Sequence, residues 1–161
     1  MFYLASTITV ILIVALQQAW PPWLQMANTT PHLGLIAVVG FGLLRGPQTG
    51  VIMGFVAAFF SAASGSAPMG DLFISHMLAG FGAGLFRGGF FSTRISVATL
   101  VVFAASIVAS LLHLLIVPPS QPQPWLYPMF MRAIFTAICC VPLYAFIRWL
   151  NSRLPGHDDQ Y

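Results

Sequence analysis

The chain has 161 residues, of which 58% are hydrophobic and only 6% are charged. Its six basic residues are all arginine and its three acidic residues are all aspartate, whereas about a quarter of the residues of a soluble domain are charged. This composition excludes a soluble enzyme, and the scattered arginines form no basic stripe that could follow a nucleic-acid backbone. We therefore expect a protein that lies in a lipid bilayer.

Apolar segments predict a single integral membrane domain over residues 1–161. A spanning helix needs roughly 20 apolar residues, and three segments reach this length without a break. The apolar stretch 33–63 is too long for one span, and Arg45-Gly46-Pro47 is expected to divide it into two short helices. The predicted spans are residues 2–20, 29–44, 48–63, 71–86, 95–117 and 128–150.

The arginines predict how these six spans are oriented. Arginine concentrates in cytoplasmic loops, and six spans with both termini inside place every arginine except Arg132 on the cytoplasmic side. Five spans would scatter the arginines over both sides. The sequence therefore predicts an all-α polytopic membrane protein, a compact bundle of six transmembrane helices.

Glycines recur at four-residue spacing in the middle of the chain. Small residues at this spacing let two helix backbones come into contact within a membrane. We favour packing inside the bundle, because six helices have more internal faces than external ones, and the alternative is a face that binds a partner's membrane helix. The glycines are Gly42, Gly46, Gly50, Gly54, Gly80, Gly84 and Gly88.

Two oppositely charged residues lie inside predicted spans at a similar depth. Asp71 opens the fourth span at its outer end, and Arg132 lies about one turn into the sixth span from the same side. Charged side chains within a bilayer usually face the interior of the bundle and pair with one another. We therefore predict an ion pair between Asp71 and Arg132 that joins the fourth and sixth spans.

Three histidines map to the same outer half of the bundle, namely His32, His76 and His113. In one interpretation His76 and His113 line a polar cavity with Asp71 and Arg132, where a small ligand or a metal ion would bind. In the other, which we favour, these side chains form hydrogen bonds between helices, because their spacing matches no metal-site pattern. The sequence contains no catalytic motif, so we expect no enzymatic activity, cofactor or resident metal.

A distinctive pattern of glycines and prolines occupies the central third of the chain, over about residues 29 to 90. It resembles the rod shape-determining protein MreD family. Members of that family often carry acidic residues at the position of His32 and near Ala62, where this chain has none. The resemblance rests on Pro31-His32-Leu33, Leu43-Leu44-Arg45-Gly46-Pro47-Gln48-Thr49-Gly50, Gly54-Phe55-Val56-Ala57-Ala58-Phe59-Phe60, Ser64-Gly65-Ser66-Ala67-Pro68-Met69-Gly70 and Leu78-Ala79-Gly80-Phe81-Gly82-Ala83-Gly84-Leu85-Phe86-Arg87.

The resemblance implies a non-catalytic scaffold or adaptor in the bacterial cytoplasmic (inner) membrane. Such a protein belongs to the cell-elongation (rod) complex and binds MreC. Through MreC it is connected to the actin-like MreB filament and to the elongation-specific peptidoglycan polymerase and transpeptidase. Its expected role is to help position lateral peptidoglycan synthesis and so to control cell shape.

The alternative function is the substrate-binding S component of an energy-coupling-factor vitamin transporter. Those proteins resemble the predicted bundle in size and in six-span architecture, and they hold their ligand near the outer side, where this chain collects Asp71, Arg132 and its histidines. A deep outer cavity or a co-purifying vitamin would favour the transporter. A filled bundle with a glycine-lined face against a partner helix would favour the adaptor.

Overall fold

A computed structural model of the chain describes residues 2–25, 29–65, 68–87, 94–118 and 125–153. These parts of the chain contain six α-helices and no strand, so the predicted all-α fold is confirmed. Each helix corresponds to one predicted span within a few residues. The helices are α1 (Phe2–Gln18), α2 (Leu33–Arg45), α3 (Pro47–Ala63), α4 (Met69–Leu85), α5 (Ile95–Ile116) and α6 (Leu126–Arg153), and the short 3-10 helix η1 (Pro22–Leu24) follows α1.

Two helices in the described ranges are long and apolar enough to cross a membrane. They are α5, with 22 residues and a mean hydropathy of 2.5, and α6, with 28 residues and a mean hydropathy of 1.9. In the most apolar 18-residue stretch of each helix, only 17% is buried for α5 and 33% for α6. Both helices therefore direct much of their apolar surface outward. Helices α1, α2 and α3 are apolar but have 17 residues or fewer.

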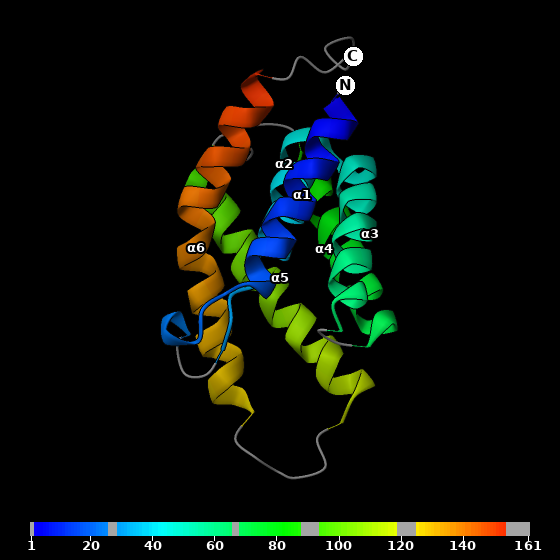
Figure 1. The fold of residues 1–161 in the computed structure, drawn as a ribbon. Helices are drawn as coiled ribbons and strands as arrows, with labels where there is room; N and C mark the ends of the chain where they lie inside the picture. The colour runs from blue at the N-terminus through cyan, green and yellow to red at the C-terminus, as the bar shows by residue number, and fades with distance from the viewer. Residues whose placement is uncertain (1, 26–28, 66–67, 88–93, 119–124, 154–161) are drawn as a thin grey trace.

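The helices run up and down the bundle in alternation, so the start of α1 and the end of α6 lie at the same end of the molecule (Figure 1). Hydrogen bonds connect three helices at this end. Arg87, which follows α4, donates from Nη1 to the carbonyl oxygen of Arg45 at 2.6 Å, and Nε of Arg45 donates to Oδ1 of Asn151 at 2.7 Å. This arginine-containing end therefore joins α2, α4 and α6.

Helix α2 lies at the centre of the bundle and contacts α1, α3, α4, α5 and α6. Every residue from Leu33 to Leu43 is buried, and in Figure 1 the other helices surround α2. A helix that is apolar on all sides is stable only when protein or lipid covers all of it. Here protein does so, which explains why a helix of only 13 residues can form.

The chain breaks between α2 and α3 at the predicted position. Helix α2 ends at Arg45, and Pro47 begins α3, where a proline is tolerated because the first amide of a helix needs no helical partner. Gly46 joins the two helices with φ of 98°, a left-handed conformation that favours glycine. An added Cβ there would also lie 2.9 Å from Cδ of Arg87.

The predicted glycine positions bring the backbones of α2, α3 and α4 into contact. An added Cβ at Gly42 would lie 2.7 Å from the carbonyl oxygen of Gly80, and one at Gly50 would collide with the same carbonyl. The four-residue spacing thus serves contacts inside the bundle, and Gly88 lies outside the described residues. The glycines in these contacts are Gly42, Gly50, Gly54, Gly80 and Gly84.

We predict that Gly80→Ala destabilises the bundle, whereas Gly82→Ala does not. The first substitution forces α3 and α4 apart, at a cost of about 1–3 kcal/mol typical of overpacking. The second, on the same helix, places its Cβ where no heavy atom lies within 4 Å, and alanine favours the helix. Thermal unfolding of the two purified variants measures the difference, and equal unfolding temperatures would contradict the packing described.

Candidate functional site

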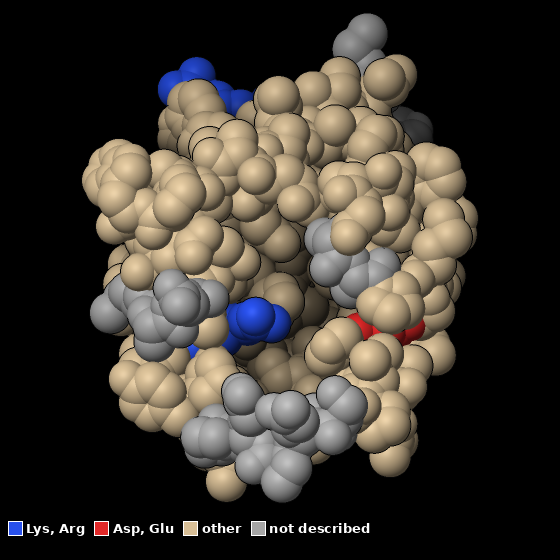
Figure 2. Space-filling model, turned by 60° about the horizontal axis from the view of Figure 1, so that its bottom comes forward, with Lys and Arg blue, Asp and Glu red and all other residues tan. Residues whose placement is uncertain are grey.

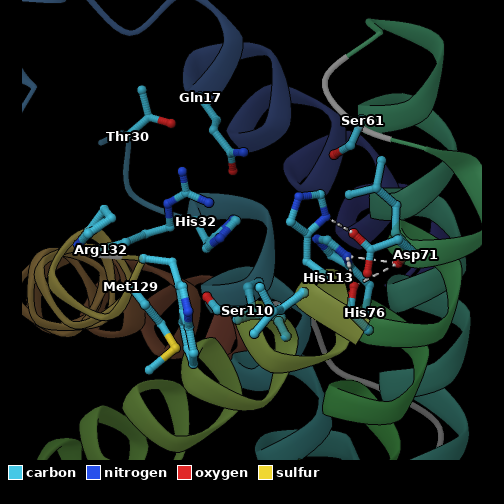
Figure 3. A pocket seen from close by; sticks show the side chains of 17 residues that line it. Gln17, Thr30, His32, Ser61, Asp71, His76, Ser110, His113, Met129 and Arg132 are labelled. Carbon is cyan, nitrogen blue, oxygen red and sulfur yellow. Dashed lines mark hydrogen bonds and ion pairs between the residues drawn. The ribbon is translucent and has the colours of Figure 1, made fainter. Parts of the chain in front are cut away.

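A cavity of about 370 Å³ opens at the end of the bundle opposite the arginine-containing end. Figure 2 shows this face hollowed between an arginine on one side and an acidic residue on the other. Helices α1, α3, α4, α5 and α6 contribute to its wall together with the start of α2 (Figure 3). The polar side chains that line the cavity are Gln17, Thr30, His32, Ser61, Asp71, Ser75, His76, Ser110, His113 and Arg132.

The N-terminus of α2 forms part of this cavity and is capped by side chains from other helices. The first amides of a helix have no partner within it. The Gly34 amide donates to Oε1 of Gln17 on α1 at 2.8 Å, and the His32 amide donates to Oγ1 of Thr136 on α6 at 3.1 Å. Sequence reasoning missed both capping residues, although each is a polar residue in a largely apolar helix.

The partner of Asp71 differs from the predicted one. Asp71 is buried, and its Oδ2 lies 2.7 Å from Nδ1 of His113. The predicted ion pair between Asp71 and Arg132 is not formed in the described part of the chain. The reason is the connection of the helices: α4 and α5 are consecutive and antiparallel, so the first turn of α4 meets the last turn of α5.

Arg132 reaches the cavity from the opposite wall (Figure 3). Its guanidinium makes no hydrogen bond or ion pair with any described residue, and its Nε is buried. Oδ1 of Asp71 is likewise buried and has no partner among the described residues. The two predicted charges thus face one cavity without contacting each other, and each retains hydrogen-bonding capacity.

His76 also lies on the cavity wall, nearly fully buried. Its Nδ1 lies 2.9 Å from the carbonyl oxygen of Leu72 in the same helix. A carbonyl oxygen only accepts hydrogen bonds, so Nδ1 carries the proton and donates it. In the neutral ring Nε2 is then left as an acceptor.

The structure brings Asp71, His76, His113 and Arg132 to a single cavity. Among the described residues there is no group of three or more His, Cys, Asp or Glu side chains that could hold a metal ion. No protein-family model and no curated protein sequence matches the chain.

We predict that Gln17→Leu destabilises the protein by about 1–3 kcal/mol, because it leaves a buried amide without an acceptor. That amide belongs to Gly34, at the start of the central helix. Gln18→Leu is the matched control, since Gln18 is exposed on the same helix. The free energy of unfolding in mixed micelles measures both effects, and an equal loss in the two variants would contradict the capping role.

Proposed function

We propose that the chain is a six-span protein of the bacterial inner membrane, with both termini in the cytoplasm, and that it acts as a non-catalytic adaptor of the rod complex. One observation carries the proposal. The segment that resembles the MreD family folds as α2, α3 and α4, and its glycines are the residues at which these helices meet. The spaced glycines that support the resemblance are therefore the same glycines that allow these helices to pack.

The surface supports a location within a bilayer. Large apolar side chains are exposed along α1 and α5, with Leu12 65% exposed and Leu115 80% exposed. Arg45, Arg87 and Arg153 all lie at the same end of the bundle, as expected for an end that faces the cytoplasm. An outward-facing apolar surface with arginines at one end suits a membrane protein of fixed orientation.

The form of the bundle supports the proposed adaptor role. The described residues belong almost entirely to helices and short connections, so contacts with a partner would use helix faces within the membrane. The proposed partner is MreC. Through MreC the bundle would help to position MreB and the peptidoglycan polymerase and transpeptidase along the side wall, and no reaction would take place in the bundle itself.

The polar cavity favours a second candidate, the S component of an energy-coupling-factor vitamin transporter. The cavity lies at the end opposite Arg45, Arg87 and Arg153, which is the outer side in the proposed orientation. The contacts between α2, α3 and α4, in turn, use Gly42, Gly50, Gly54, Gly80 and Gly84 inside the bundle. These two observations are those expected of a ligand-binding bundle.

Affinity purification from native membranes in a mild detergent tests the two candidates against each other. We expect the tagged chain to recover MreC, and a second six-span protein carrying the same tag serves as the control for nonspecific recovery. Recovery of an ATPase with its membrane coupling subunit, and no MreC, would overturn the adaptor proposal in favour of the transporter.

A further inference from the structure

The cavity has the size and chemistry of a site for a small ligand. Its volume of about 370 Å³ falls within the range of small-molecule pockets. Its two charged groups occupy opposite walls, with Asp71 on α4 and Arg132 on α6 (Figure 3). Apolar side chains such as Leu35, Leu114 and Met129 also line the cavity.

On the acidic side of the cavity, one carboxylate oxygen of Asp71 has no hydrogen-bond donor among the described residues. Asp71 is only 4% exposed, and one of its carboxylate oxygens is used by His113. The other, Oδ1, is buried without a partner in the described ranges. Buried acceptors are almost always satisfied by protein, water or a bound molecule. An N–H group of a ligand, above all a charged ammonium, would satisfy this oxygen.

On the basic side of the cavity, Nε of Arg132 is buried and has no acceptor among the described residues. The guanidinium of Arg132 presents several N–H donors in a planar fork that suits a carboxylate or a phosphate, and no described residue accepts from it. Arg132 also lies near the N-terminus of α2, whose partial positive charge favours an anion. Charged side chains inside a membrane bundle usually pair with an opposite charge, and Asp71 does not pair with Arg132, because it pairs with His113.

We propose that this cavity binds a small zwitterion whose carboxylate or phosphate contacts Arg132 and whose ammonium contacts Asp71. The site goes beyond the adaptor role, because it depends only on how the helices of the bundle enclose the cavity and not on a partner protein. Two sources offer this chemistry, namely a free amino acid and the phosphoethanolamine headgroup of a lipid. Both present an anion and an ammonium only a few bonds apart.

Isothermal titration of the purified protein in detergent tests the proposal with L-phenylalanine and phosphoethanolamine as probes. Each zwitterion has analogues that lack one charge: 3-phenylpropionate and 2-phenylethylamine for the first, inorganic phosphate and ethanolamine for the second. We expect at least one zwitterion to bind about tenfold or more tightly than its own single-charge analogues. Absence of binding by both zwitterions, or equal binding of a zwitterion and its analogues, would overturn the proposal.

Variants then test the two ends of the site separately. Arg132→Gln and Asp71→Asn should each weaken binding of the zwitterion about tenfold or more, whereas Arg132→Lys should retain part of it. Arg153→Gln is the matched control, because Arg153 lies at the far end of the same helix, against Trp149. Unchanged affinity in Arg132→Gln would overturn the proposal. The comparison of analogues on the unaltered protein remains decisive if a variant fails to fold.

Native mass spectrometry distinguishes the two sources. Phosphatidylethanolamine retained by the unaltered protein and lost from Arg132→Gln would identify the lipid headgroup, whereas binding of free L-phenylalanine without retained lipid would identify a soluble ligand. Either result supports the site. Recovery of MreC by the unaltered protein is a separate measurement, so the zwitterion site and the adaptor role succeed or fail independently.

Discussion

The burial of α2 on all sides is the constraint on which the rest of the structure depends. No residue between Leu33 and Leu43 is accessible, so the neighbouring helices must cover the whole circumference of this helix. Close coverage is possible because Gly42 lets the backbone of α4 approach, and because Gln17 and Thr136 satisfy amides at the start of the helix. Packing and capping therefore act on the same short segment.

The cavity follows from the length of this central helix. At about 1.5 Å per residue, the 13 residues of α2 span about 20 Å, whereas the 22 residues of α5 span about 33 Å. The surrounding helices continue past the point where α2 begins, and a space is left beyond its N-terminus. His32 and Leu35 lie at the boundary of this space, and the polar side chains of the neighbouring helices line it.

The positions of the helices could be predicted because the sequence shows both the lengths of the apolar segments and the residues that interrupt them. Gly46 and Pro47 mark a break by their backbone chemistry alone, and the structure has it there. The partner of Asp71 could not be read in this way. In helices that are apolar on most sides, little in the sequence shows which face each helix turns toward its neighbours. The prediction of Arg132 rested on its similar depth in the membrane, whereas the order and direction of the helices bring His113 to Asp71.

The same limitation applies to the caps and to the cavity. Gln17 and Thr136 are recognisable as polar residues in apolar helices. The amides that donate to them lie at the start of α2, which is distant from Thr136 in sequence. The shared depth of Asp71, His76, His113 and Arg132 indicated one polar region. These residues enclose a space and do not all contact one another, because the short central helix α2 begins below them.

Photolabelling of the protein in liposomes with a membrane-partitioning diazirine tests most directly whether a bundle within the bilayer surrounds α2. The labelled residues are identified by mass spectrometry of peptides. The account predicts labelling of exposed side chains of α5 such as Leu100 and Leu115, 69% and 80% exposed, and none between Leu35 and Leu43. Labelling of α2 at the level of α5, or an unlabelled α5, would contradict it.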